Sequence, residues 1–364
     1  MMALVYGFKK VDLNSLEENK ASTYFSVIIP FRNETENLSA LLDSIEKLKY
    51  PSHLFEIIFV NDASEDNSEA IISKAMDKSK FSIKLIQNNR ISASPKKDAI
   101  SEAIKNSQFE WIVTTDADCK IPPNWLYSFH SVIIDRQQKG SKNKPVMICG
   151  PVKYETNGSL IENFQQLDGL SLQTVTIGSF GFKNPIFSNG ANLAYTKNAF
   201  LKVNGFSGND HIASGDDIFI LEKMKKIFPG QIEYLKAKEA IVSTKPQKSW
   251  QTILNQRIRW ASKTSKQKSI ASIFLGGLVF LVNISILTLP ILMILKPQNL
   301  IFYVLIIVFK IITDFIFLQQ SSKFFNVKIS IWKFPLQTFI YAIIIFLVVL
   351  KSLRGNYSWK GRSF

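Results

Sequence analysis

Two aspartates follow an apolar run in an arrangement that suits a metal ion. Residues 111–113 are Trp, Ile and Val, and Asp116 and Asp118 come soon after them. On an extended backbone, residues two apart point the same way, so both carboxylates can face one hard divalent cation and the diphosphate that it carries. A solvated turn also explains an Asp-x-Asp pattern, since Asp is a common turn residue. The elements around the pair therefore decide between the two interpretations.

The first half of the chain alternates β-branched runs with stretches of helical spacing. The strand-like runs cover residues 26–29, 56–60, 83–86, 111–113 and 146–149, and the helical stretches cover residues 34–48, 67–78, 95–106 and 125–138. Pro95 suits the first turn of the third helix, and Ser94 can cap it. Repeated βα units predict an α/β fold whose mostly parallel sheet is covered on both faces and binds ligands beyond the carboxyl ends of its strands.

Polar motifs stand at the ends of these strands and continue beyond them. In chain order they are Pro30-Phe31-Arg32-Asn33-Glu34, Asn61-Asp62-Ala63-Ser64, Lys96-Lys97-Asp98-Ala99-Ile100, Asp116-Ala117-Asp118, Asn189-Gly190-Ala191-Asn192-Leu193-Ala194, Gly215-Asp216-Asp217 and Gln256-Arg257-Ile258-Arg259-Trp260. In this order the motifs resemble family 2 glycosyltransferases, the group that includes the cellulose and hyaluronan synthases and the ceramide glucosyltransferases. The resemblance covers residues 25–262. It implies the Rossmann-like GT-A fold and transfer of a sugar from a nucleotide-diphosphate sugar.

The resemblance implies a set of residues that bind the nucleotide-sugar donor. Asp62 matches the acid that contacts the base, and a carboxylate there can accept a hydrogen bond from the uracil N–H. Lys96 matches a lysine whose point charge meets the diphosphate. Two positions depart from the family pattern, because Asn61 replaces an acid and Pro95 replaces a glycine. The expected donor-binding residues are Pro30, Arg32, Glu34, Asp62, Lys96, Asp116, Gln256, Arg259 and Trp260.

The resemblance also assigns the metal site and catalysis. Asp118 is the expected metal ligand, and Asp116 shares the ion or contacts the ribose and diphosphate. Mg²⁺ or Mn²⁺ is expected, because the ligands are oxygens and the chain has no His or Cys cluster to select zinc. Asp217 matches the general base of an inverting transfer, which removes the proton of the acceptor hydroxyl, and Asp216 orients the site. Arg259 completes the catalytic set by neutralising charge on the departing diphosphate.

Residues 247–268 have the spacing of an amphipathic helix. Trp250, Ile253 and Trp260 fall within roughly 80° of one another at about 100° per residue. We expect this helix to lie at the membrane interface, where the Trp260 ring offers a flat apolar face to a sugar or acceptor. The preceding residues 151–245 are less periodic and are expected to build the acceptor pocket.

Three apolar runs near the C-terminus, residues 270–295, 300–318 and 334–350, approach the ~20 residues that a helix needs to cross a bilayer. They predict a multi-pass protein of the cell's inner membrane. The first run contains Gly276, Gly277, Asn283 and Pro290, so it is the one expected to be irregular. The first 25 residues lack a long apolar stretch. We therefore expect no signal peptide and a cytoplasmic catalytic domain.

The net charge of +15 is concentrated beside the apolar runs, since residues 269–364 contain nine Lys or Arg and a single acid, Asp314. This excess suits anionic lipid headgroups and an anionic nucleotide substrate. Nucleic acid is not expected as a partner, because no nucleic-acid motif accompanies the charge. Lys310 and Asp314 lie four apart inside the second run and are expected to pair, with a path for the acceptor headgroup as the alternative role of Asp314.

The positive-inside rule conflicts with three full spans. Three spans that start from a cytoplasmic domain place the C-terminal tail outside, whereas Lys351, Arg354, Lys360 and Arg362 favour the cytoplasm. One of the apolar runs is then re-entrant or interfacial. Cys119 and Cys149 are too few for a disulfide framework and fit a reducing compartment.

The sequence thus predicts five segments. They are an N-terminal extension at 1–24, the GT-A glycosyltransferase domain at 25–246, the interfacial helix at 247–268, the transmembrane region at 269–351 and a basic tail at 352–364. The predicted function is inverting transfer from a nucleotide sugar, such as a UDP-hexose, to a lipid or lipid-linked acceptor at the cytoplasmic membrane face. A processive polysaccharide synthase subunit is the alternative within the same chemistry. A catalytically silent membrane scaffold that only binds nucleotide sugar is the alternative outside it.

Overall fold

The structure is a computed structural model that describes residues 1–15, 20–138, 144–264, 270–352, 358–359 and 362–363. The chain divides into two compact units. The sheet unit comprises Lys9–Lys153 and Ser179–Lys245, and the helical unit comprises Met1–Phe8, Tyr154–Gly178 and Pro246–Phe364. The segment predicted as one domain, residues 25–246, is therefore shared between the two units.

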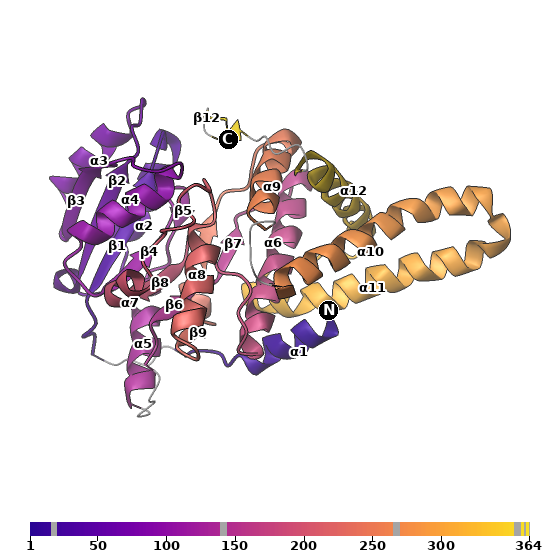
Figure 1. Cartoon of the computed structure of the whole chain (residues 1–364), viewed down its shortest axis with the longest axis horizontal. Helices are drawn as coiled ribbons and strands as arrows, with labels where there is room; N and C mark the ends of the chain where they lie inside the picture. The colour runs from indigo at the N-terminus through magenta and orange to yellow at the C-terminus, as the bar shows by residue number, and fades with distance from the viewer. Residues whose placement is uncertain (16–19, 139–143, 265–269, 353–357, 360–361, 364) are drawn as a thin grey trace. The chain divides into compact units, whose positions relative to one another are not determined.

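Parallel strands dominate the main sheet of the sheet unit (Figure 1). Among the described residues it has seven strands in the order β3-β2-β1-β4-β8-β6-β9. Their bounds are β1 Phe25–Phe31, β2 Phe55–Asn61, β3 Ser82–Gln87, β4 Trp111–Thr114, β6 Met147–Cys149, β8 Leu193–Thr196 and β9 Ile232–Tyr234. β1 pairs in parallel with β2 and β4, and β2 pairs in parallel with β3, whereas β8 is antiparallel to β4 and β6. The predicted α/β fold with a mostly parallel sheet is confirmed.

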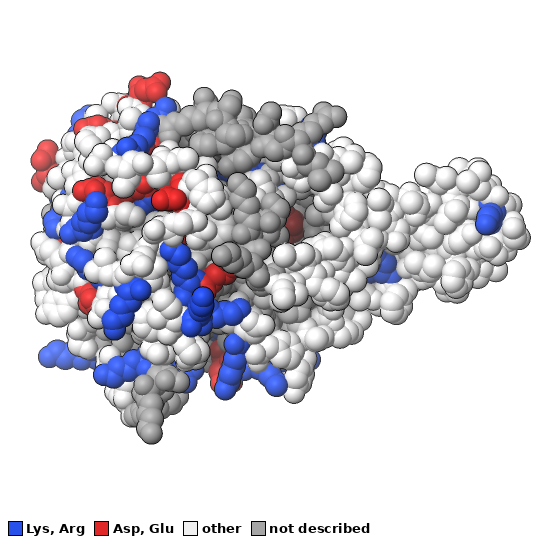
Figure 2. Space-filling model, viewed as in Figure 1, with Lys and Arg blue, Asp and Glu red and all other residues white. Residues whose placement is uncertain are grey.

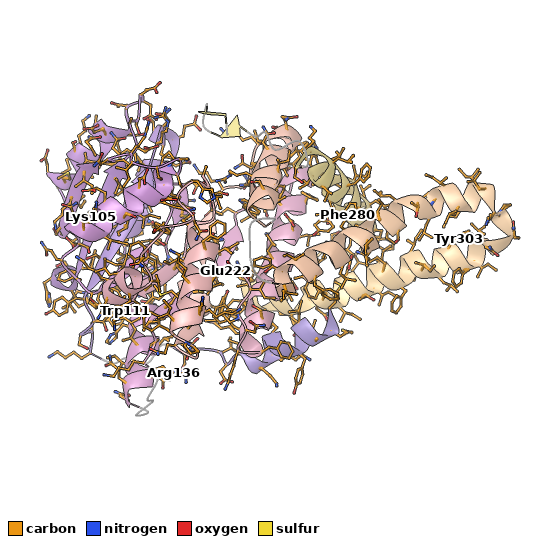
Figure 3. All side chains as sticks on the ribbon, in the orientation of Figure 1. Lys105, Trp111, Arg136, Glu222, Phe280 and Tyr303 are labelled. Carbon is orange, nitrogen blue, oxygen red and sulfur yellow. The ribbon has the colours of Figure 1, made fainter. Side chains whose placement is uncertain are left out.

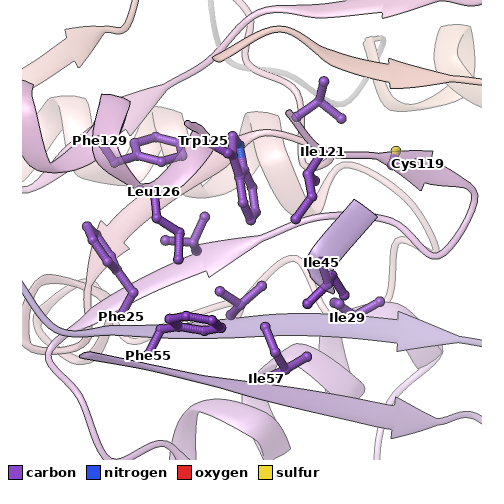
Figure 4. Packing of buried hydrophobic residues seen from close by; sticks show 14 of the residues in the cluster. Phe25, Ile29, Ile45, Phe55, Ile57, Cys119, Ile121, Trp125, Leu126 and Phe129 are labelled. Carbon is purple, nitrogen blue, oxygen red and sulfur yellow. The ribbon is translucent and has the colours of Figure 1, made fainter. Parts of the chain in front are cut away.

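Helices cover this sheet on both faces, as the βα repeat requires. Their bounds are α2 Thr35–Glu46, α3 Ser68–Met76, α4 Pro95–Asn106, α5 Trp125–Gln138, α7 Lys197–Lys202 and α8 Asp216–Ile227, with the short 3-10 turns η1 Ser52–Leu54 and η2 Lys238–Ala240. Figure 4 shows Phe55 and Ile57 of β2 facing the same core as Leu126 and Phe129 of α5. All seven residues of β2 are buried, which is why it reads as a continuous apolar run rather than an alternating one.

A second, smaller sheet continues from the predicted metal-binding aspartates. It contains β5 Cys119–Lys120, β10 Val242–Thr244 and β7 Val152–Tyr154, in the order β5-β10-β7. β5 pairs antiparallel with β10, through Lys120 with Ser243 and Cys119 with Thr244. The residue that follows Asp118 is thus held by backbone hydrogen bonds, which limits how far the loop between β4 and β5 can move.

The helical unit consists mainly of long helices. Its elements are most of α1 Met2–Lys10, most of α6 Leu160–Gly181, α9 Trp250–Thr264, α10 Ile270–Leu295, η3 Pro297–Asn299, α11 Leu300–Phe325, α12 Phe334–Ser352 and the short strands β11 Ser358–Trp359 and β12 Arg362–Ser363. On α9, Ile253, Leu254 and Ile258 form a buried cluster with Phe164 of α6 and Ile344 of α12. The predicted amphipathic helix therefore exists and packs through its apolar face. Its expected residues 265–268 lie outside the described part of the chain.

Three helices among the described residues are long and apolar enough to cross a membrane: Ile270–Leu295, Pro297–Phe325 and Phe334–Ser352. The surface along α10 and α11 is almost wholly uncharged in Figure 2. Phe280 and Tyr303, labelled in Figure 3, belong to these two helices. Inside α11, Lys310 donates to the Asp314 carboxylate, so the expected pair is present. One turn of helix separates the two residues, which lets them screen each other.

The structure corrects three local predictions. Residues 160–181, expected to be irregular, form the 22-residue helix α6. α10 runs unbroken through its glycines and Pro290, although this run was the one expected to be irregular. The Ser94 hydroxyl makes no capping hydrogen bond to α4. Two backbone N–H groups of the first turn of α4, at Lys97 and Asp98, are instead satisfied by the Ser94 carbonyl oxygen. Residues 353–357, 360, 361 and 364 of the basic tail, which include Arg354 and Lys360, lie outside the described residues.

Candidate active site

Lys96 joins two of the predicted site aspartates. Its Nζ lies 2.7 Å from Asp116 Oδ1 and 3.0 Å from Asp216 Oδ2. The three side chains come from the first turn of α4, from the loop after β4 and from the first turn of α8. Each stays partly accessible, with exposed side-chain fractions of 23% for Lys96, 36% for Asp116 and 13% for Asp216. The fold thus gathers residues spread over 120 positions into one contact group that solvent can still reach.

The two carboxylates control the charge of Lys96. Burial by itself lowers the pKa of a lysine, but Asp116 and Asp216 outweigh that effect and raise the pKa of Lys96 above its usual value. The ammonium group therefore stays charged at any pH that the protein meets. A fixed positive charge beside two carboxylates is able to exchange one of them for an incoming phosphate oxygen.

Gly190 makes room for this group. A side-chain carbon on Gly190 would lie 2.7 Å from Asp216 Oδ2 and 3.4 Å from Lys96 Nζ. The Gly190 carbonyl accepts a hydrogen bond of 2.7 Å from Thr114 Oγ1, which ties the loop before β8 to the end of β4. The sequence motif at 189–194 carried no assigned role. The close approach of backbone to the charged side chains supplies one.

Asp118 lies one residue before β5, half-buried like Asp116. The neighbouring Cys119 thiol lies 3.6 Å from Asp118 Oδ1. Burial, together with Asp118 and Asp116, raises the pKa of Cys119, so this sulfur stays protonated and is a poor ligand. Among the described residues no group of three or more His, Cys, Asp or Glu side chains could hold a metal by itself. The donors here fit an ion such as Mg²⁺ or Mn²⁺ that takes one or two carboxylates and completes its shell with phosphate and water oxygens.

Asp62 follows β2 and is held by one amide group and one guanidinium group. Its Oδ1 accepts hydrogen bonds from Asn88 Nδ2, at 2.7 Å, and from Arg90 Nε. Arg90 Nη2 also donates to the Asp62 carbonyl oxygen at 2.7 Å. The carboxylate is therefore fixed at the carboxyl edge of β2, the edge where Asp116 also stands. Arg90 was missed by the sequence analysis, because no local pattern indicates that an arginine after β3 reaches back to β2.

Arg32 and Glu34 connect the loop after β1 to its neighbours. Arg32 Nη1 donates to the Asp62 and Ala63 carbonyl oxygens, and its Nη2 lies 2.9 Å from Glu65 Oε1. Glu34 Oε2 accepts a 2.6 Å hydrogen bond from Asn37. Arg32 thus supports the loop that carries Asp62, whereas Glu34 binds the first turn of α2 and Pro30 is a half-buried residue within β1. Direct contact of these residues with a nucleotide stays a prediction.

Asp217 begins α8 with Asp216, directly after Gly215. Gly215 has φ 85°, a conformation that other residues adopt at a cost, and it turns the chain into the helix. The partial positive charge of a helix N-terminus favours carboxylates at this position. Asp217 Oδ1 accepts a hydrogen bond of 2.8 Å from the Ile218 N–H, which holds the carboxylate at this helix start. Burial raises the pKa of the Cys149 thiol, and Asp217 adds to that rise.

Gln256, Arg259 and Trp260 lie on α9, in the helical unit. Their neighbour Arg257, to which the sequence assigned no role, is ion-paired with Asp168 of α6. The Arg257 guanidinium also lies 4.1 Å from the centre of the Trp260 ring, at cation–π distance, and donates to Gln256 Oε1 at 3.2 Å. Arg257, in the middle of the motif, thus contacts two of the motif's residues, Gln256 and Trp260. Its contribution to the site of the sheet unit stays a prediction.

Two family models match the chain. The model described as glycosyl transferase family 2 matches residues 26–140, and the model described as glycosyl transferase family group 2 matches residues 111–350. Together they cover the loops that carry Asp62, Lys96 and Asp118 and the helices α8 to α12.

The curated relatives of this chain include poly-beta-1,6-N-acetyl-D-glucosamine synthases. The protein of Staphylococcus epidermidis is 25% identical over 236 residues, which are 65% of this chain and 53% of that protein. The protein of Staphylococcus aureus strain COL is 31% identical over 110 residues, which are 30% of this chain and 24% of that protein. The chain thus matches about half the length of the first relative and about a quarter of the second.

A solved structure has the same fold. A mannosyltransferase from Pyrobaculum calidifontis, determined in complex with GDP-Man and Mn²⁺, superposes with a TM-score of 0.59. The match covers 96% of this chain and 94% of that one, at 14% sequence identity. At this identity the likeness concerns the fold.

Proposed function

This chain belongs to glycosyl transferase family group 2, and on that premise we propose that it transfers a sugar from a nucleotide-diphosphate sugar, with inversion, to a lipid or lipid-linked acceptor. The observation that carries the proposal is the contact of Lys96 with Asp116 and Asp216. It combines a cation suited to a diphosphate with carboxylates suited to a metal and to proton transfer, at the edge where a parallel sheet binds ligands.

Each residue has a part in the proposed transfer. Asp118 and Asp116 hold a divalent cation, Mg²⁺ or Mn²⁺, which when bound supplies positive charge next to the donor diphosphate. Lys96 binds a diphosphate oxygen. Asp62 accepts the N–H of the base, and its hydrogen bonds from Asn88 and Arg90 keep its second oxygen oriented.

The acceptor is activated by Asp217. Its carboxylate takes the proton of the acceptor hydroxyl as that oxygen attacks the anomeric carbon from the face opposite the diphosphate. The bond from the anomeric carbon to the diphosphate oxygen breaks, and the nucleoside diphosphate leaves with the electron pair. Arg259 neutralises its charge, and the Trp260 ring packs against a sugar or the acceptor. Asp216, next to Asp217 in the first turn of α8, orients the site.

Membrane anchoring supports a lipid acceptor. The three apolar helices would hold the enzyme in the inner membrane, where a lipid-linked substrate is delivered in two dimensions. We place the catalytic domain on the cytoplasmic side, where nucleotide sugars are made. The names of the relatives favour a second candidate, a polysaccharide synthase, and make N-acetylglucosamine the first sugar to test.

The test uses membranes that contain the full chain, incubated with a panel of labelled UDP- and GDP-sugars and Mn²⁺. Label in the lipid extract supports the lipid acceptor, and label in an insoluble or high-mass polymer supports the synthase. Asp118→Ala protein, or wild-type protein treated with EDTA, should transfer nothing while remaining folded in the membrane. Full activity of either preparation contradicts the metal assignment, and the absence of any transfer by wild-type protein favours the silent scaffold.

A further inference from the structure

Lys97, next to the site lysine, is buried in an unusual way. Its side chain is in the fully buried class, with 1% of the residue exposed. Its Nζ donates to the Asn209 carbonyl oxygen at 2.7 Å and to the Ile212 carbonyl oxygen at 2.8 Å. The same ammonium lies 4.9 Å from the centre of the Phe219 ring. Lysine is among the residues least often buried completely, so this placement is costly unless the ammonium group is well satisfied.

The partners of Lys97 all lie around the start of α8. Asn209 and Ile212 belong to residues 203–215, a segment of turns and bends that joins α7 to α8 and contains neither helix nor strand. Phe219 lies in the first turn of α8, and its N–H binds the Gly215 carbonyl. The Asn209 and Ile212 carbonyl oxygens, which lie outside any helix or strand, therefore accept hydrogen bonds from one ammonium group. Lys97 thus fixes the segment that delivers Asp216 and Asp217.

Consecutive residues on α4 therefore hold the same turn of α8 from two directions. Side chains one residue apart on a helix diverge by about 100°. Lys96 points to the Asp216 carboxylate and remains accessible, whereas Lys97 points into the core. A donor diphosphate competes with Asp216 for Lys96, because both are anions that bind the same ammonium. Lys97 cannot be reached by substrate, so its contacts persist through such an exchange.

We propose that Lys97 is a positioning residue for the general base: it keeps Asp217 in place when the donor diphosphate takes over Lys96. This inference rests on the proposed function, because it needs Asp217 as the base and Lys96 as the diphosphate ligand. The substrate class is unchanged. The new assignment is that Lys97, a buried lysine of α4, holds the start of α8, which carries Asp217.

A second lysine in the same segment serves as a matched control. Lys223 of α8 donates to the carbonyl oxygens of Val203, Gly205 and Ser207, at 3.3, 2.6 and 2.7 Å. Like Lys97, it satisfies backbone carbonyls of the segment between α7 and α8. These three partners lie at the beginning of the segment, farther along the chain from Asp217 than Asn209 and Ile212 are. Loss of Lys223 therefore removes comparable hydrogen bonds without releasing the first turn of α8.

The experiment compares Lys97→Met and Lys223→Met in the full chain in membranes. Methionine keeps most of the length of the side chain and removes the ammonium. For Lys97→Met we expect kcat to fall by roughly 10²-fold, the scale of a misplacement of about 1 Å, with the donor KM and UDP binding changed less than about threefold. Backbone N–H groups of residues 209–217 should exchange with deuterium faster. Lys223→Met should keep wild-type kcat.

Two results overturn the inference. The first is wild-type kcat in a folded Lys97→Met protein. The second is an equal fall in kcat for both variants, which would indicate general loosening of the segment. If Lys97→Met does not accumulate, Lys97→Gln decides, because its amide is uncharged and one bond shorter and so cannot hold both carbonyl oxygens as the ammonium does. A selective fall in kcat supports the inference, and wild-type kcat overturns it. Failure of the proposed function is distinguishable, since wild-type protein would then transfer no sugar at all.

Discussion

Removal of the Asp168 carboxylate should destabilise the helical unit far more than loss of a surface ion pair does. Asp168 and Arg257 form an ion pair with side-chain exposures of only 8% and 10%. Burial raises the pKa of Asp168, while the Arg257 guanidinium opposes that rise. In Asp168→Ala the guanidinium stays buried beneath Trp260 without its counter-ion.

The magnitude follows from this burial. Breaking one side of a buried pair typically costs about 3–5 kcal/mol, because the remaining charge is uncompensated. At about 2 °C per kcal/mol, the lower end of the range for larger domains, the midpoint of unfolding should fall by at least about 6 °C. The double variant Asp168→Leu with Arg257→Met removes both charges and should return to within about 1 kcal/mol of wild-type stability.

The assay is thermal unfolding of the full chain in detergent, followed by tryptophan fluorescence. The proteins compared are wild type, Asp168→Ala, the single variants Asp168→Leu and Arg257→Met, and the double variant. An exposed pair on α4 supplies the control: Lys105, labelled in Figure 3, lies 3.1 Å from Glu102 and is 67% exposed. Lys105→Ala should cost less than about 1 kcal/mol. A midpoint for Asp168→Ala within about 2 °C of wild type, or a double variant no more stable than the singles, would refute the reasoning.

Three further outcomes are expected. Asp217→Asn should lower turnover by roughly 10²-fold or more while UDP still binds; normal turnover would move the base to Asp216. Lys310→Leu should lower the yield of inserted protein, and addition of Asp314→Leu should restore yield and activity; a double variant that inserts but is inactive favours the acceptor-path role of Asp314. Burial alone would raise the pKa of Asp66, but hydrogen bonds from its neighbours lower it to about 2, below the unfolded value of 3.8. The stabilisation that Asp66 contributes is therefore present above about pH 4 and is lost as the pH falls towards 2. Because the group is exposed, this contribution should be less than about 1 kcal/mol, and Asp66→Asn should make the free energy of unfolding correspondingly less dependent on pH in this range. Equal acid unfolding curves for the two proteins would contradict this assignment.

The predictable part of the fold rests on local patterns. The runs at 56–60 and 95–106 correspond to β2 and α4 within one residue at either end, because apolar periodicity and Pro95 act within the segment itself. Helix α6 was missed because its buried and exposed residues do not form one regular stripe. Its residues Asp168 and Thr174 are buried through partners on α9 and α11, Arg257 and Ser321, which a local window does not contain.

For the site, residue type and order along the chain determined the candidates. Asp116, Asp118 and Lys96 could be named because each stands where a strand ends or a helix begins, and parallel strands bring such ends to one edge. Their contact partners could not be named. That Lys96 binds Asp216, 120 residues away, or that Lys97 binds the carbonyls before α8, depends on how α4 and α8 pack.

The sequence by itself therefore determined the chemistry: which side chains carry charge, which segments are apolar enough for a membrane, and which edge of the sheet holds the polar motifs. The tertiary structure alone decided which of two adjacent lysines meets the carboxylates and which is buried, and that Arg257 pairs with Asp168. The physical reason is distance along the chain. Periodicity and turn propensity act over a few residues, whereas the desolvation and pairing of a charge depend on groups that only the packed fold brings within about 4 Å.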